Sequence, residues 1–309
     1  MGTWKPALHI LLLLLLGGSY VTCEEWCYDK PSCGPHTWYS LGQCSGAYQS
    51  PINIETRKAL PGTHLGPLNF IGYENRMLPK SLTNTGHYAE VEMRSGAAIF
   101  GKGLPATYYL KSFHFHWGKH NKPGSEHAVD GKRYDIELHI VHTKNNMSSE
   151  EARKDPEGFA VLGFFLQGDN GASKIDAWKT LADRLELIPE KGDSVLLAGE
   201  FSMGGLLSKA VVNNYFRYRG SLTTPDCNES VIWTVFPEPI SITHKVVKKF
   251  IDSLYFTTKA EGRRMQDNFR PVQPIKKQKV FYFEESKHSN DLTSSGRFGK
   301  QGGTVASNH

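Results

Sequence analysis

Three histidines on two short segments could hold a metal ion. His114 and His116 lie in the segment 111–117, and His139 lies in 134–142. Three neutral imidazoles occupy three of the four tetrahedral positions of a zinc ion, and the fourth stays open to water or substrate. An open position is typical of a catalytic zinc site, whereas structural sites are closed by four protein ligands.

Both segments are predicted to be strands, because apolar and polar residues alternate and aromatic or β-branched types dominate. Residues two apart on a strand point to the same face. His114 and His116 therefore project together, while Phe113, Phe115 and Trp117 face the other way, toward a core. A bare His-x-His pair is a weak signal, since ordinary polar packing or surface imidazoles give the same pattern. His139 on a second strand strengthens the metal interpretation.

Glu137 precedes His139 by two residues, so the two side chains share a strand face. A carboxylate there could hold the second ring nitrogen of a metal-bound histidine. A solvated or salt-bridged glutamate is the alternative. His142 lies three residues beyond His139, on the opposite face, and we leave it out of the site.

The composition indicates a soluble globular protein. The chain has 309 residues, of which 39% are hydrophobic and 22% charged, with a net charge of +5. This length allows one large domain or two small ones and a sizeable core. Lys276, Lys277 and Lys279 form the densest basic cluster, which we interpret as a solvated surface run. No basic stripe with interleaved aromatic residues indicates binding to nucleic acid.

The first 23 residues have the pattern of a secretory signal peptide. Lys5 gives a positive n-region, and Leu11 to Leu16 form an apolar h-region that is too short to span a bilayer. Cleavage ahead of Glu24 would remove this segment. No later segment is predicted to span a membrane.

Four cysteines would remain after cleavage, and an oxidising compartment would join them into two disulfides. Three pairings are possible. We favour Cys27–Cys33 as a local link and Cys44–Cys227 as a long-range link. Two glycosylation sequons, at Asn146 and Asn228, agree with secretion, although each is a weak signal.

Short strand candidates separated by turn residues recur along the chain, at 88–93, 111–117, 134–142, 159–166 and 231–236. Two segments show helical spacing, 175–187 and 245–255. We therefore expect one strand-rich domain over residues 24–286. Residues 287–309 are rich in Ser, Gly, Asn and Lys and are predicted to be a disordered tail.

Several further motifs surround the histidines in order along the chain, from about Trp26 to Pro274. They are Gln-Ser-Pro-Ile-Asn-Ile (49–54), Gly-His (86–87), Phe-His-Phe-His-Trp-Gly (113–118), Ser-Glu-His (125–127), Glu-Leu-His-Ile-Val-His (137–142), Ser-Leu-Thr-Thr-Pro (221–225) and Asn-Phe-Arg-Pro (268–271). Together they resemble the α-class carbonic anhydrases. The cysteine pattern is similar to that of the extracellular subgroup with the GPI-anchored types four and fifteen.

The resemblance implies an α+β, mainly β fold: a large, twisted, mostly antiparallel sheet with peripheral helices. It also implies an enzyme, a zinc lyase that hydrates carbon dioxide to bicarbonate. The implied zinc ligands are His114, His116 and His139. Residues that would orient or assist them are Glu137 for His139, the Asn268 carbonyl for His116, and His127 in a buried hydrogen-bond network.

Thr223 and Glu126 would orient the attacking hydroxide, and His87 would carry protons to buffer. Carbon dioxide would lie against an apolar wall, and bicarbonate near Thr224; the implied lining residues are Val141, Val161, Leu222, Thr223, Thr224 and Trp233. The resemblance further implies sulfonamide-type inhibitors, and we expect a monomer. Without the resemblance, the threonines are turn residues, the valines core positions, and His87 a surface histidine.

Four positions depart from the family pattern. Ser112 stands where a glutamine usually orients the first zinc ligand, and serine is shorter. Thr85, Glu90 and Phe159 replace other residues near the expected shuttle and pocket. In addition, the polar stretch 297–309 lacks the hydrophobic tail that GPI attachment needs, so we expect an unanchored, secreted chain.

Two other functions fit the same motifs. A binding module could keep the fold without catalysis, although such domains typically lose a zinc histidine. A zinc esterase could use the same site, although a narrow apolar pocket disfavours bulky esters. Zinc analysis distinguishes a binding module from the enzyme. Assays with small and bulky esters beside carbon dioxide distinguish an esterase from a carbonic anhydrase.

Overall fold

A computed structural model describes residues 26–172 and 175–285. The predictions for residues 1–23 and for 287–309 lie outside the described residues. Among the residues described, no helix is long and apolar enough to cross a membrane.

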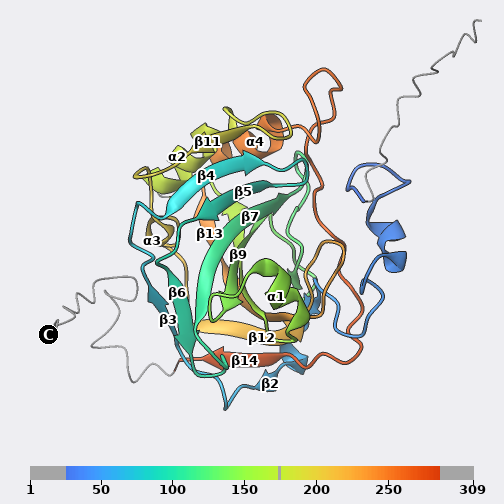
Figure 1. Ribbon diagram of the computed structural model, residues 1–309, viewed down its shortest axis with the longest axis vertical. Coiled ribbons are helices and arrows are strands. Elements are labelled where there is room, and N and C mark those ends of the chain that lie inside the picture. Colours follow the sequence, from blue (N-terminus) through green and yellow to red (C-terminus); the bar gives the residue numbers. More distant parts are fainter. Residues whose placement is uncertain (1–25, 173–174, 286–309) are drawn as a thin grey trace, which may run out of the picture.

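A single twisted sheet of twelve strands forms the body of the molecule (Figure 1). From one edge its main path runs β11 (Ser194–Leu196), β4 (Pro79–Asn84), β5 (Ala89–Met93), β7 (Tyr108–Trp117), β9 (Ile136–Lys144), β10 (Phe159–Gly168), β13 (Val231–Ile242), β12 (Asn214–Gly220), β14 (Phe281–Glu284) and β2 (Leu60–Pro61). Only the pairs β10–β13 and β14–β2 within this described sheet are parallel. The prediction of a mostly antiparallel central sheet is therefore confirmed.

Two strands off this path complete the twelve. They are β3 (Leu68–Ile71) and β6 (Ala98–Gly101), which pair with each other, and β6 also pairs with β7. A separate pair is formed by β1 (Asn53–Ile54) and β8 (Ala128–Val129).

Short helices lie around the sheet. They are α1 (Ser149–Lys154), α2 (Asp176–Leu185), α3 (Met203–Leu206), α4 (His244–Ser253) and the 3-10 turns Pro35–Ser40 and Thr56–Lys58. The helix α1 starts at a capping box, in which Ser148 and Glu151 each bond the other's backbone N–H. The helices α2 and α4 lie together along the β4 side of the sheet (Figure 1).

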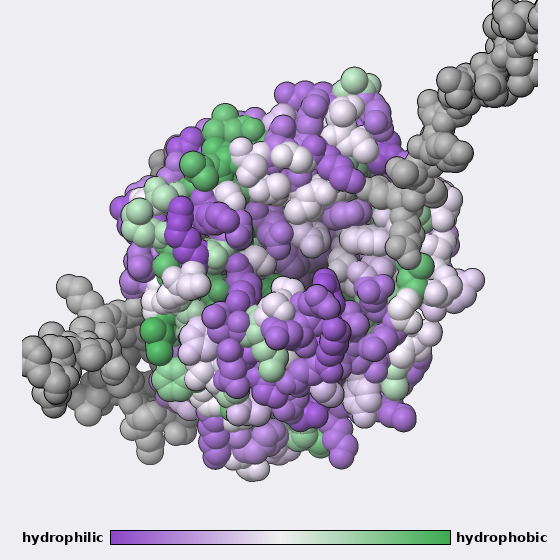
Figure 2. All heavy atoms as spheres, in the orientation of Figure 1, coloured by the Kyte–Doolittle hydropathy of each residue, from purple (hydrophilic) through white to green (hydrophobic). Residues whose placement is uncertain are grey.

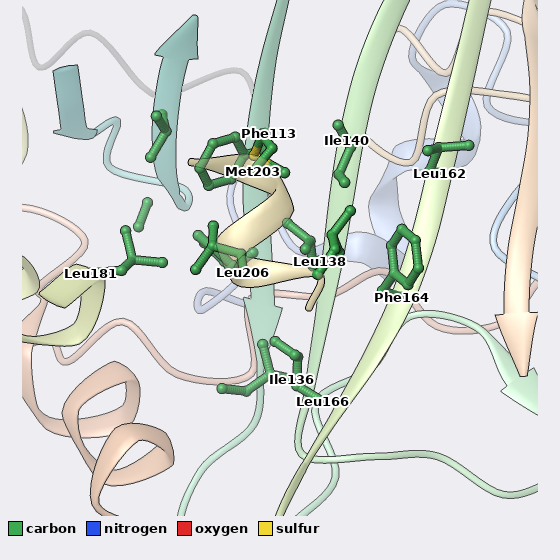
Figure 3. Packing of buried hydrophobic residues seen from close by; sticks show 14 of the residues in the cluster. Phe113, Ile136, Leu138, Ile140, Leu162, Phe164, Leu166, Leu181, Met203 and Leu206 are labelled. Carbon is green, nitrogen blue, oxygen red and sulfur yellow. The ribbon is translucent and has the colours of Figure 1, made fainter. Parts of the chain in front are cut away.

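The central strands β7 and β9 present their apolar side chains to one face of the sheet. Phe113, Phe115 and Trp117 are fully buried there, as the alternating pattern predicted. Figure 3 shows Phe113 near Met203 and Leu138 near Leu206, both residues of α3. Because the pleat alternates, the histidines of the same strands must point to the opposite face.

The five predicted strands and two predicted helices are all present, with ends shifted by a few residues. The strand predicted at 111–117 begins three residues earlier, at Tyr108, and that at 134–142 runs from Ile136 to Lys144. The sequence analysis missed the other nine described strands, including β4 and β12 on the main path of the sheet. Most of the missed strands have two to four residues, too few to show an alternating pattern, whereas β4 and β12 have six and seven.

Both favoured disulfides are present. Cys27 pairs with Cys33, and Cys44 pairs with Cys227 across 183 residues. The long link ties the N-terminal segment to the loop that follows Thr223 and Thr224, next to the histidine face.

Removing the long link should cost more stability than removing the short one. The chain-entropy model gives roughly 5 kcal/mol for a loop of this length and about half of that for the Cys27–Cys33 loop. Denaturant unfolding of Cys44→Ser/Cys227→Ser, with Cys27→Ser/Cys33→Ser as the matched control, measures both losses. Equal losses would contradict the loop-length argument.

His142 lies on the apolar face of β9, as its odd spacing from His139 predicted. Its ring is fully buried between two partners: Nε2 lies 2.7 Å from the Tyr73 hydroxyl, and Nδ1 lies 3.1 Å from the Ala160 carbonyl oxygen. Burial lowers the pKa of His142 from 6.5 to about 4, because the charged ring would lose its hydration. The side chain is therefore a neutral core histidine.

Stability should fall in acid because of this one residue. The unfolded chain takes up a proton on His142 below about pH 6.5, whereas the folded chain resists until about pH 4, so the unfolding free energy decreases across that window. The expected loss is about 3 kcal/mol. Unfolding free energies measured from pH 7 to pH 4 should fall less steeply in His142→Gln; equal slopes would contradict the assignment.

Candidate active site

The three predicted ligands converge on the open face of the central strands. His114 on β7 lies directly opposite His139 on β9, and His116 is two residues further along β7. The ring centroids are 5.0, 5.2 and 4.7 Å apart. One nitrogen from each ring can be chosen so that all three atoms lie within 4.8 Å of one another. This is the spacing of a three-histidine metal site.

A buried carboxylate orients His139. Glu137 Oε1 accepts hydrogen bonds from His139 Nε2 and from His127 Nδ1, each at 2.7 Å, and Oε2 accepts the His127 backbone N–H. Burial alone would raise the pKa of Glu137, but the contacts with His127 and His139 outweigh it and hold the pKa well below its usual range. With Nε2 engaged, His139 presents Nδ1 to the other two histidines.

The network continues beyond His127 into the floor of the site. His127 Nε2 lies 2.6 Å from the Tyr218 hydroxyl, which lies 2.8 Å from Ser50 Oγ. Ser50 Oγ also accepts the backbone N–H of Ser221. A chain of hydrogen bonds thus fixes the ring of His127 and, through Glu137, the ring of His139.

His116 is oriented by a backbone carbonyl. Its Nδ1 lies 2.8 Å from the Asn268 carbonyl oxygen, and the Asn268 side chain accepts the Trp117 backbone N–H. His116 Nε2 is fully buried and has no hydrogen-bond partner among the described residues. Buried polar atoms in proteins normally have a hydrogen-bond partner. This nitrogen has none in the described part of the chain and lies beside two other imidazoles, so it is available to bind a metal ion.

His114 is held less firmly than the other two. Its ring stacks on Tyr88, with centroids 4.6 Å apart, but Nδ1 is buried and has no hydrogen-bond partner in the described part of the chain. Ser112, two residues earlier, instead bonds Glu90 on the neighbouring strand. The departure noted in the sequence therefore leaves one candidate ligand without the acceptor that the others have.

The donor set fits a zinc ion. Burial lowers the pKa of His114 and of His116, and the neighbouring imidazoles lower it further, so both rings are neutral and offer lone pairs. Three imidazoles with an open fourth position match the preference of catalytic zinc.

Glu126 lies beside the same nitrogens. Its Oε2 is 3.6 Å from His116 Nε2 and 3.9 Å from His139 Nδ1, while Oε1 accepts the Arg270 backbone N–H at 2.7 Å. Oε2 has no hydrogen-bond partner within the described residues, so it is able to accept one from Thr223. That hydrogen bond stays a prediction.

A cavity of about 140 Å³ opens beside the histidines. Figure 2 shows a hollow near the middle of this face, rimmed mainly by hydrophilic side chains. All six residues expected to contact the substrate line the cavity. The full lining is Tyr88, Glu90, Ser112, His114, His139, Val141, Ser149, Arg153, Phe159, Val161, Leu222, Thr223, Thr224 and Trp233.

His87 does not line this cavity, although the next residue, Tyr88, does. Its ring stacks on Trp26 at 3.9 Å, and its carbonyl oxygen accepts a hydrogen bond from Asn268 Nδ2. The residue that orients His116 therefore also anchors His87.

Three lining residues were missed from the sequence. Tyr88 could have been found, because it is two residues from Glu90 and so shares its strand face. Ser149 and Arg153 belong to α1, which lies across the front of the sheet (Figure 1). No local pattern in the sequence indicates that this short helix borders the site.

The two sequons differ in exposure. Asn146 is exposed, in a turn with positive φ, and Lys111 Nζ bonds its side-chain oxygen at 2.7 Å. Asn228 is half-buried, with a buried side-chain oxygen, in the loop closed by the Cys44–Cys227 disulfide. Asn146 is the better placed of the two for a glycan.

Comparison with known proteins agrees with this geometry. The family model for eukaryotic-type carbonic anhydrase matches residues 33–284. This chain belongs to the eukaryotic-type carbonic anhydrase family. Carbonic anhydrase 4 of Mus musculus is 37% identical over 283 residues, covering 88% of this chain and 90% of that protein. Carbonic anhydrase 15 of Mus musculus is 37% identical, with 85% of each chain covered.

Carbonic anhydrase 7 of Homo sapiens is 40% identical over 259 residues, which cover 81% of this chain and 94% of the human protein. The chain is accordingly an enzyme of the carbonic anhydrase class, and its family acts on a small-molecule substrate.

Giving His114 an acceptor should tighten zinc binding in this carbonic anhydrase. In Ser112→Gln the longer amide reaches toward His114 Nδ1, and the expected gain is about tenfold in zinc affinity. Competition with a chelator measures the affinity. Ser112→Ala is the matched control: because Ser112 bonds Glu90 and not His114, its zinc affinity should stay within about twofold of wild type. A large loss in the alanine variant would contradict the geometry.

Proposed function

We propose that the protein catalyses the reversible hydration of carbon dioxide to bicarbonate and a proton, with a zinc ion bound by His114, His116 and His139. The observation that carries the proposal is the convergence of three imidazoles beside a small cavity with an apolar wall. A zinc ion there supplies Lewis acidity, which makes a hydroxide nucleophile available near neutral pH.

The cavity supports a small, neutral substrate. Val141, Val161, Leu222 and Trp233 form an apolar wall, which suits a molecule without net charge or dipole. Thr223 and Thr224 lie at the same wall and offer hydroxyls to an oxyanion product. A volume of about 140 Å³ disfavours bulky esters.

The carboxylates and the other histidines orient the nucleophile, hold the zinc ligands and transfer the proton. Glu126 Oε2 accepts a hydrogen bond from the Thr223 hydroxyl, so that the threonine oxygen is left to accept a hydrogen bond from the nucleophile and orients it. Glu137 and the Asn268 carbonyl hold His139 and His116, while His127 holds Glu137. His87 carries the proton that each turnover releases, because an imidazole titrates near neutrality.

The proposal extends to the compartment. Two disulfides indicate an oxidising environment, which supports secretion and a role in extracellular pH and bicarbonate balance. In this proposal the mature protein is a monomer that carries a glycan at Asn146, with Asn228 as a second acceptor. Sulfonamides, whose nitrogen is a zinc ligand, would compete for the open position.

Stopped-flow carbon dioxide hydration by the purified protein tests the reaction and the shuttle together. Wild-type protein should turn over rapidly, and His87→Ala should be slower by about tenfold or more, with imidazole buffer restoring the rate. A variant that is slow and is not restored by imidazole would sink the shuttle assignment. Negligible turnover of folded, zinc-containing wild type would sink the reaction itself and favour a binding module.

A further inference from the structure

A second cavity, of about 360 Å³, lies away from the histidines at the outer part of the sheet. It borders β12 where β14 ends, since β14 pairs with β12 only from Asn214 to Arg217. The cavity is lined by Tyr48, His64, Gly103, Pro105, Glu157, Arg217, Tyr218, Arg219, Ile232, Lys277, Gln278, Lys279 and Phe281. No residue of this set has a role in the proposed reaction except Tyr218, which belongs to the His127 network.

The charges around this cavity do not balance. Four cationic side chains line it, Arg217, Arg219, Lys277 and Lys279, against the single carboxylate of Glu157. That carboxylate is already engaged, because Arg219 bonds Glu157 Oε1. Lys277 and Lys279 are exposed at the rim and form no ion pair with any described residue. The cavity therefore has a surplus of positive charge.

One of these positive charges, that of Arg217, is buried in the interior. The side chain is only 4% exposed, and its polar partners are neutral: Nε bonds Thr234 Oγ1 at 3.0 Å, and Nη1 bonds the Gly103 carbonyl oxygen at 2.9 Å. Nη2 has no hydrogen-bond partner among the residues that the structure describes. Burial lowers the pKa of Arg217, with only Tyr215 and Tyr108 near enough to oppose the shift.

The backbone around Arg217 is arranged to hold the guanidinium in place. Gly103 has φ of +87°, and a Cβ there would lie 3.4 Å from Arg217 Nη1 and 2.5 Å from Leu65, so only glycine allows this close approach. The guanidinium also lies 5.1 Å from the Tyr215 ring. Buried charges in proteins are normally paired with an opposite charge, and this one is positioned but unpaired.

We propose that this cavity binds a small tetrahedral oxyanion, phosphate or sulfate, free or as a small monoester. Arg217 Nη2 would donate to the anion from within, and Lys277 and Lys279 would close over it from the rim. A planar guanidinium together with lysine ammonium groups is the chemistry that recognises such oxygens. More than one cation favours a doubly charged anion over chloride or acetate. The site is separate from the zinc ligands, so it does not depend on the proposed reaction.

Thermal unfolding of the zinc-loaded protein, titrated with phosphate at constant ionic strength, tests the site. The melting temperature of wild type should rise with phosphate and follow a saturable, one-site curve. Parallel titrations with sulfate, methyl phosphate and acetate distinguish the sources: free anions and the monoester should bind, and acetate should bind about tenfold more weakly.

Two variants and one matched control keep the outcome decisive. Arg217→Gln should lose the phosphate-dependent rise whatever its starting melting temperature. Lys277→Gln/Lys279→Gln leaves the buried side chains untouched and should weaken phosphate binding about tenfold. Lys179→Gln/Lys248→Gln removes the same charge from exposed positions on α2 and α4 and should bind as wild type does.

Equal phosphate binding by wild type and all three variants would overturn the proposal, because it would place the anion elsewhere, for example at the open zinc position. A rise that never saturates, or that both double variants reduce alike, would also overturn it, because it would reflect net charge alone. Carbon dioxide hydration measured on the same samples is a separate readout, so a failed reaction and a failed anion site remain distinguishable.

Discussion

The antiparallel pairing of β7 and β9 is the constraint on which the site depends. Its register places His114 directly opposite His139, and the pleat sends both histidines and His116 to one face. The other face carries Phe113, Phe115, Leu138 and Ile140, all fully buried. A shift of one residue would turn the aromatic side chains to the cavity and the imidazoles into the core, so burial of the apolar face fixes the geometry of the candidate metal ligands.

The candidate ligands are further restrained by hydrogen bonds to neighbouring groups. Glu137 joins His139 to His127, and the Asn268 carbonyl holds His116, so two of the three rings are fixed in both tautomer and direction. Buried polar networks of this kind are stable only when each member is satisfied, and the chain from Glu137 to Ser50 meets that condition. His114 is the exception, with aromatic stacking on Tyr88 in place of a hydrogen bond. The site therefore has one ligand that is positioned by packing alone.

Two buried basic side chains, His142 and Arg217, differ in their charge state and in their surroundings. His142 is buried between neutral partners and escapes the cost of burial by staying neutral, as its lowered pKa indicates. Arg217 cannot lose its proton in the same range, and it lines a cavity instead of the solid core. A buried residue that must remain charged needs a counter-ion, and the second cavity offers space for an anion beside Arg217.

The sequence by itself determined the central strands, the face on which the histidines lie and the role of Glu137 as their neighbour, because a strand's period of two is local information. The ordered motifs indicated the family. The four cysteines allowed three disulfide pairings, and the favoured one is present in the structure. Only the tertiary structure decided which distant residues close the site. Arg153 reaches the cavity because α1 crosses the sheet, and Ser112 turns to Glu90 because β5 pairs beside it. The unpaired guanidinium of Arg217 is held by Thr234, which lies opposite it on β13, and by Gly103, which is 114 residues away in the chain. Contacts of that kind leave no periodic signal in the sequence.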